Sequence, residues 1–190
     1  MMFFSPKQTS TAVKQYKDLR SLCLKVISFV LYKYEDYDFE IEFWGLFFMS
    51  VKSSIESFKH EGSSSEKPSS LFSCFLAMSR SHKLMPLLAR ERNLVPDIFS
   101  ILTVSTASQS IISFVLQFIE NLLTYDGELD DNDSAVRSVL LPNLDSLIQN
   151  LHVLFQSGDA KKRYVFLSMM MCIIVFAVKI IYHAKHQPSF

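Results

Sequence analysis

The segment Ser108–Tyr125, SQSIISFVLQFIENLLTY, decides the fold of this chain. Its apolar residues follow one another at steps of three and four residues, which is the period of an α-helix. They cover most of the helix circumference: Ile111, Ile112, Val115, Leu116, Phe118, Ile119, Leu122 and Leu123. A helix that is apolar nearly all round must be covered on two sides, like the inner helix of a stacked array. The segment therefore predicts an all-α fold of stacked helices.

Towards the N-terminus, the same period predicts a helix from about Thr11 to Lys33. Its predicted apolar face consists of Val13, Tyr16, Leu19, Leu22, Val26, Phe29 and Val30. The opposite side carries the charged residues Lys14, Lys17, Asp18 and Arg20. Such a division into an apolar and a charged side is typical of a helix that packs on one face.

An acidic turn, Tyr34–Asp38, separates this helix from a second predicted one. The apolar stripe of the second helix consists of Phe43, Phe47, Val51, Ile55 and Phe58, widened by Trp44 and Phe48. Acidic residues gather at its start (Asp36, Asp38, Glu40 and Glu42) and basic ones towards its end (Lys52, Lys59 and His60). The helix dipole favours this order of charges, so the paired carboxylates need no acid–base role.

The rest of the chain continues with helices and connectors. Gly62–Ser70 is a predicted loop, and Asp126–Asp133 is a predicted acidic connector. Short helices with Pro86 and Pro96 in their first turns lie between them, and a last amphipathic helix through Leu140–Phe155 is expected to bend near Pro142. The result is about six or seven helices without a strand, in pairs near the ~40–47-residue repeat of HEAT-type arrays. This period alone does not distinguish an array from a plain bundle.

Composition restricts the classes of function. The chain has 190 residues, 49% apolar, with 4 Gly, 6 Pro and a formal net charge of zero. So few glycines argue against a Gly-rich cofactor loop, and the balanced charge provides no general positive field for a phosphate backbone. Cys23, Cys74 and Cys172 each lie in an apolar run, which predicts buried thiols in a reducing compartment rather than disulfides or zinc ligands.

Four ungapped strings carry a family resemblance: KYEDYDFEIEFWGLFF (Lys33–Phe48), EKPSSLFSCFLAMSRSHKLMPLL (Glu66–Leu88), NLVPDIFSILTV (Asn93–Val104) and SVLLPNLDSLIQNLHVLF (Ser138–Phe155). From about Thr11 to Arg163 the chain resembles the very large HEAT-repeat scaffold of the small-subunit processome, also called the down-regulated-in-metastasis family. The order of amino acids in these strings is similar to that of the plant members of the family.

The resemblance implies an α-solenoid of HEAT-like, armadillo-like helix pairs at residues 11–163, after a flexible start at residues 1–10. It implies a fragment of a far longer, non-catalytic nucleolar scaffold that acts in 18S rRNA processing and small ribosomal subunit assembly. The implied partners are pre-ribosomal proteins of the processome. Pre-rRNA would be contacted by the full-length assembly and not clearly by this segment.

The tail, residues 164–190, does not align with the family and is treated as a separate hydrophobic segment. A retained intron would explain the abrupt change, and normally spliced transcripts across the codons for Lys162–Tyr164 would exclude that origin. A membrane-spanning helix needs about 20 apolar residues, and Tyr164–Tyr182 barely reaches that length. Two readings of the tail therefore stay open: a C-terminal membrane anchor, or one more buried or loosely packed helix.

No catalytic, cofactor-binding or metal site is predicted, and a helical enzyme is the least favoured reading. His183 and His186 have the spacing of a helix face but lack the further ligands of a zinc site, while His60, His82 and His152 are isolated. The Asp126–Asp133 run lacks the residue order of a calcium loop. Neither a Gly-x-Ser-x-Gly turn nor a phosphate-binding Gly-rich loop is present in the sequence.

Four rings are candidates for stacking on single-stranded RNA: Phe47, Phe48, Phe114 and Phe118. Stacking needs exposed rings beside a positive groove. Because these four lie on apolar helix faces, they are predicted to pack in the core instead.

Overall fold

The computed structural model describes residues 10–61, 68–81, 83–104, 107–123, 139–157 and 160–186. These residues form helices α1 (Ser10–Lys33), α2 (Ile41–Glu61), α3 (Pro68–Arg80), α4 (Leu94–Ser100), α5 (Gln109–Leu123), α7 (Leu144–Gln156) and α8 (Ala160–His186). Short 3-10 helices η2 (Met85–Arg90), η3 (Ile101–Thr103) and η4 (Leu141–Asn143) lie between them. The described ranges contain no strand, so the predicted all-α class is confirmed there.

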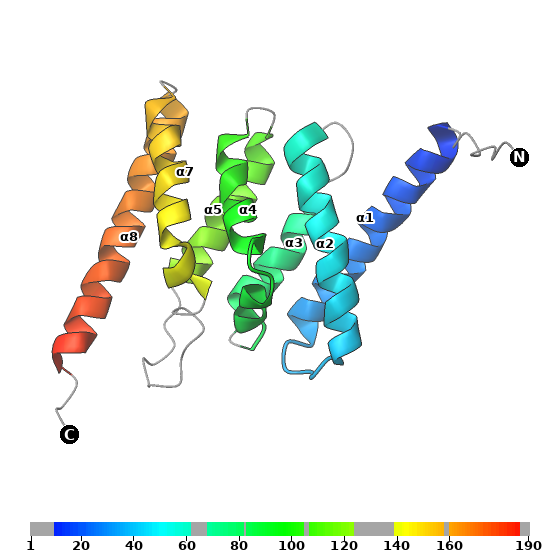
Figure 1. Ribbon diagram of the computed structural model, residues 1–190, viewed down its shortest axis with the longest axis horizontal. Helices are drawn as coiled ribbons and strands as arrows, with labels where there is room; N and C mark the ends of the chain where they lie inside the picture. Colours follow the sequence, from blue (N-terminus) through cyan, green and yellow to red (C-terminus); the bar gives the residue numbers. More distant parts are fainter. Residues whose placement is uncertain are drawn as a thin grey trace, which may run out of the picture.

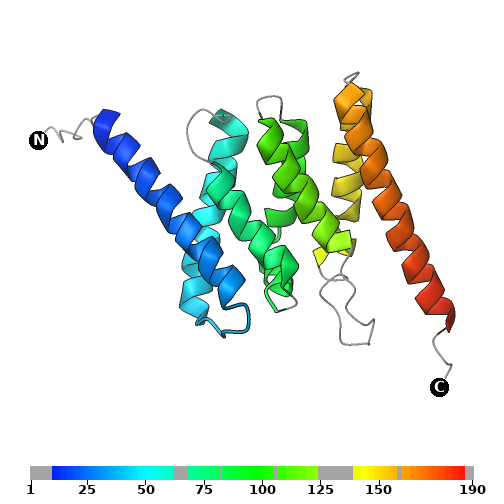
Figure 2. The same ribbon diagram turned by 180° about the vertical axis from the view of Figure 1, so that it is seen from behind.

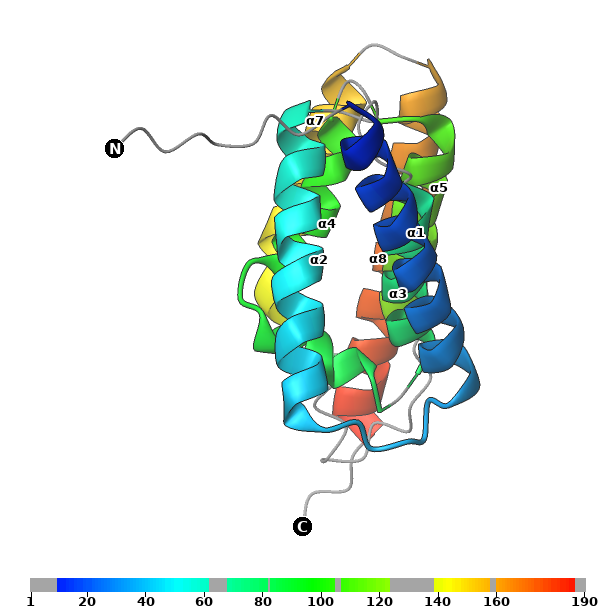
Figure 3. The same ribbon diagram turned by 90° about the vertical axis from the view of Figure 1, so that its right-hand side faces the viewer.

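The helices form two layers. Helices α1, α3, α5 and α8 follow one another side by side in one layer, and α2, α4 and α7 form the other (Figures 1 and 3). Helices of one layer run parallel, while α1 and α2 run antiparallel (Figure 1). Seen from behind, α1 and α8 stand at opposite ends of their layer (Figure 2). This stacking of antiparallel pairs is the predicted α-solenoid.

Helix α5 has the central position that its sequence predicts. It lies between α3 and α8 and also contacts η3. Its buried side chains are Ile111, Val115, Phe118, Ile119, Leu122 and Leu123. The Phe118 ring meets that of Phe99 from α4 at a centroid distance of 6.4 Å, so α5 also joins the two layers.

Polar side chains connect α1 to its two neighbours. Arg20 donates to the main-chain oxygen of Ser50 in α2 at 2.8 Å and also to the Ser54 hydroxyl. On the α3 side, the hydroxyls of Ser21 and Ser70 lie 2.9 Å apart in a buried position. Since buried hydroxyls and cations need partners, these bonds fix how α1 sits on both helices.

The prolines mark helix starts. Helix α3 begins at Pro68, inside the predicted loop Gly62–Ser70, because proline is well accommodated at the first helical position. Pro142 does not bend a continuous helix, which corrects the prediction: it lies in η4, and α7 begins after it at Leu144. The acidic connector Asp126–Asp133 and residues 1–9 lie outside the described residues.

The side of α1 that packs is not the one with the conspicuous apolar stripe. Of that predicted face, Tyr16, Leu19, Leu22, Val26 and Phe29 are all more than half exposed. The buried residues of α1 are Ser21, Leu24 and Leu31 instead. The expected orientation is therefore wrong, because periodicity shows where apolar residues lie on a helix but not which side has a neighbour.

Helix α8 runs without a break across the predicted boundary between residues 163 and 164. Met169 and Phe176 are buried, and the helix contacts both α5 and α7. The predicted C-terminal hydrophobic helix therefore exists and packs as the last helix of its layer. Among the residues described, no helix combines the length and the apolar character that crossing a membrane requires.

The three cysteines differ in exposure. Cys74 is buried and donates to the main-chain oxygen of Leu24 at 3.2 Å, Cys172 is half-buried, and Cys23 is exposed. The prediction of buried thiols is thus confirmed for Cys74 and wrong for Cys23, which lies on the uncovered side of α1. Burial raises the pKa of the Cys74 thiol from 9.0 to about 12.

We expect alkylation to separate Cys74 from Cys23. Only the thiolate is a good nucleophile, so Cys74 in the folded chain is expected to react at pH 8 at least about a hundredfold more slowly than Cys23. Peptide mapping after timed treatment with iodoacetamide measures both rates. Urea-denatured protein, in which all three cysteines react, is the control, and equal rates in the folded chain would contradict the described burial.

Candidate interaction surfaces

Helix α1 presents an uncovered apolar surface at one end of the stack. We call Tyr16, Leu19, Leu22 and Val26 the α1 face; their side chains are 64%, 61%, 58% and 54% exposed. The four recur at steps of three and four residues along one side of the helix. A continuous apolar stripe of this kind on a folded chain marks a surface that another apolar surface can cover.

Helix α8 presents a second such surface at the opposite end. We call Leu167, Met171, Ile174, Val175 and Val178 the α8 face; each side chain is at least half exposed. The other side of α8 packs against α5 and α7. Each end helix thus buries one side and leaves an apolar side uncovered by the described residues, as terminal units of a repeat array without polar caps do.

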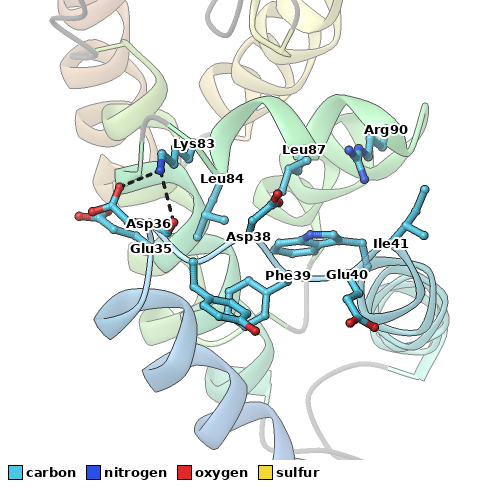
Figure 4. A pocket seen from close by; sticks show the side chains of 12 residues that line it. Glu35, Asp36, Asp38, Phe39, Glu40, Ile41, Lys83, Leu84, Leu87 and Arg90 are labelled. Carbon is cyan, nitrogen blue, oxygen red and sulfur yellow. Dashed lines mark hydrogen bonds and ion pairs between the residues drawn. The ribbon is translucent and has the colours of Figure 1, made fainter.

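A cavity of about 670 Å³ lies where the α1–α2 turn meets the segment before η2 (Figure 4). Glu35, Asp36, Asp38 and Glu40 line one side, and Lys83, Leu84, Leu87 and Arg90 line the other. The Lys83 amine lies 3.2 Å from the Asp36 carboxylate, with both groups well exposed. An exposed pair of this kind contributes little stability, at most about 1 kcal/mol.

The aromatic rings beside this cavity serve to pack the turn. The Phe39 ring stacks on that of Phe43 at 4.9 Å and meets Trp44 edge-on at 5.8 Å. Trp44 itself is only 5% exposed, so its ring faces are occupied by the protein. Among the predicted cluster of acidic residues, Glu42 lies in the first turn of α2, where the helix dipole favours a negative charge.

A groove of about 450 Å³ lies along the surface where α1 and α3 meet. We call it the α1–α3 groove; it is lined by Lys25, Ser28, Phe29, Tyr32, Ser73, Leu76, Ala77 and Arg80. Phe29 and Tyr32 are 62% and 63% exposed. Sequence reasoning missed this site because it assigned Phe29 to a packed face. Two sets of positions with the same spacing could have indicated the groove: residues 25, 28, 29 and 32, and residues 73, 76, 77 and 80.

The rings considered from sequence for stacking are packed, as predicted. Phe47, Phe48 and Phe118 are at most 4% exposed, and Phe114 is half-buried against the core. The rings of Phe47, Phe48 and Phe118 are therefore unavailable to a stacking ligand, unlike those of the α1–α3 groove.

Of the five histidines, His152 is the one whose side chain the structure describes. His152 is exposed on α7 and its ring lies 2.9 Å from the Gln156 amide. His82 lies outside the described residues, as do the side chains of His60, His183 and His186. In the described part of the chain, no group of three or more His, Cys, Asp or Glu residues is placed to hold a metal ion.

A family model described as U3 small nucleolar RNA-associated protein 20, N-terminal, matches residues 5–176 of the chain. The matched range includes α1 to α7 and extends into α8, past the boundary at residues 163 and 164 that the sequence suggests. That boundary stays a prediction. Neither a curated protein nor a solved structure gives a significant match to the chain.

Proposed function

Because the chain belongs to the family of U3 small nucleolar RNA-associated protein 20, a ribosome-biogenesis family, we propose that it acts as a scaffold segment of the small-subunit processome. Its role would be in 18S rRNA processing and small ribosomal subunit assembly in the nucleolus. One structural observation supports this proposal: a two-layer stack ends in two uncovered apolar surfaces, the α1 face and the α8 face. Exposed apolar surfaces of this kind are typical of a chain whose function is to bind other proteins.

The proposed mechanism is geometric. In a HEAT-like array each helix pair contacts mainly its neighbours, so the stack presents a long surface on which other proteins are held in fixed relative positions. The partners would be pre-ribosomal proteins. Pre-rRNA would be held by the larger assembly.

We further propose that the segment has no catalytic role. The polar contacts that the structure brings together serve to join helices: Arg20 with Ser54, Ser21 with Ser70, and the Asn121 amide with the Ser79 hydroxyl at 2.8 Å. Each of these has a structural use between neighbouring helices. A scaffold accounts for them without any reacting group.

A fluorescent fusion of the full chain tests the proposed location. We expect the signal to concentrate in nucleoli, where it would overlap with a pre-rRNA probe. A second fusion that lacks residues 164–190 serves as the control. Endoplasmic-reticulum or mitochondrial signal that disappears with this deletion would contradict the scaffold and favour a membrane role.

A further inference from the structure

The α1–α3 groove is built from two parallel stripes. Lys25, Phe29 and Tyr32 recur along α1, and Ser73, Ala77 and Arg80 recur along α3 at matching steps. Seven residues of helix cover about 10 Å, so the groove is roughly as long as two or three stacked nucleotides at ~3.4 Å each. Leu76 and Ala77 are buried and form its floor.

The groove is locally positive although the whole chain is neutral. Lys25 and Arg80 line it, and Lys33 follows at the end of α1. Helix α3 contains no acidic residue, and none occurs in α1 between Lys25 and Lys33. Within the residues described, neither Lys25 nor Arg80 takes part in an ion pair. Both cations are therefore available to an anion from outside.

Two exposed rings accompany these cations. Phe29 and Tyr32 are three residues apart on α1, so their rings project from the same side of the helix. More than half of each side chain is open to solvent at the groove. Exposed rings beside unpaired cations are the two elements with which proteins hold single-stranded nucleic acid: bases stack on rings while the backbone follows the positive charges.

We propose that the α1–α3 groove binds single-stranded RNA, with one base stacked on Phe29 and the next on Tyr32. Lys25 and Arg80 each contact a phosphate, and Ser28 lies between Lys25 and the two rings along α1, in the lining of the groove. The proposal rests on the groove alone and goes beyond the scaffold role. An acidic peptide would use the cations but leave the rings without a planar partner, so the groove favours RNA.

Fluorescence anisotropy with a labelled ten-nucleotide oligouridine tests the proposal on the full chain. The double variant F29A/Y32A is expected to weaken binding at least about tenfold, since each base–ring stack contributes substantially to affinity. The matched control is Y16A, which removes an equally exposed ring of the same helix outside the groove. Unchanged circular dichroism of all three proteins shows that the fold is intact.

The charges are tested in the same way. K25E/R80E is expected to weaken binding at least as much as the ring variant, whereas K14E, on α1 but outside the groove, leaves it within about twofold. With two phosphate contacts, the logarithm of the binding constant should fall with the logarithm of salt concentration with a slope of about −1.4.

Three results would overturn the proposal. The first is an anisotropy of the labelled oligouridine that does not rise above its value without protein. The second is an equal loss in Y16A and F29A/Y32A. The third is displacement of the RNA by a ten-residue polyglutamate as effectively as by unlabelled oligouridine, which would assign the groove to an acidic protein segment.

Discussion

Phe118→Ala is expected to lower the free energy of unfolding by about 3–5 kcal/mol, the usual effect of deleting a buried aromatic side chain. Phe118 is 1% exposed and contacts Phe99 across the two layers. Its loss leaves a cavity between α4 and α5 that the surrounding helices can fill only in part. Urea denaturation followed by circular dichroism measures the change.

The matched control is Phe29→Ala, the same substitution at a ring that is 62% exposed. Removing it is expected to change the free energy of unfolding by no more than about 0.5 kcal/mol. Equal destabilisation of the two variants would contradict two points. It would mean that α5 does not occupy the centre of the stack, and that α1 packs through the side that carries Phe29.

The second large effect is expected at the α1 face. The chain alone is expected to self-associate and to be poorly soluble, because both ends of the stack carry uncovered apolar stripes. In Leu19→Lys/Val26→Lys, two of these side chains become charged. Burial of each is worth about 1.5–3 kcal/mol, so the apparent dissociation constant of self-association is expected to rise at least about a hundredfold.

Sedimentation velocity over a range of protein concentrations measures this change. Gln117→Lys/Gln149→Lys is the control, because it adds the same charge at two exposed polar positions on α5 and α7, outside both faces. Wild-type protein that stays monomeric and highly soluble at all concentrations would contradict the assignment of the α1 face as an uncovered docking surface.

The sequence is sufficient to predict the parts of the fold that depend on local pattern. The apolar residues of Ser108–Tyr125 surround most of their helix, so the central position of α5 follows from the need to cover them. The all-α class follows from the same period along the chain. Pro86 and Pro96 lie in the first turns of η2 and α4, as predicted, because a proline there lacks only a hydrogen bond that the first turn does not use.

The sequence does not show which helix packs against which side of its neighbour. The stripe with Leu19 and Val26 is the most apolar side of α1, yet α3 packs against the side with Ser21 and Leu24. Hydrogen bonds across the helices, rather than apolar content, mark that side. The α1–α3 groove escapes prediction for the same reason: Tyr32 and Arg80 are brought together only by the packing of two helices.

Recovery of U3 small nucleolar RNA with the tagged chain tests the central claim most directly, namely that this is a scaffold segment that works through its end faces. We predict enrichment of the RNA with the wild-type chain and with Gln117→Lys/Gln149→Lys. Leu19→Lys/Val26→Lys, with an unchanged melting curve, is predicted to lose most of it. Failure to recover the RNA with the wild-type chain, or equal recovery with all three proteins, would contradict the account.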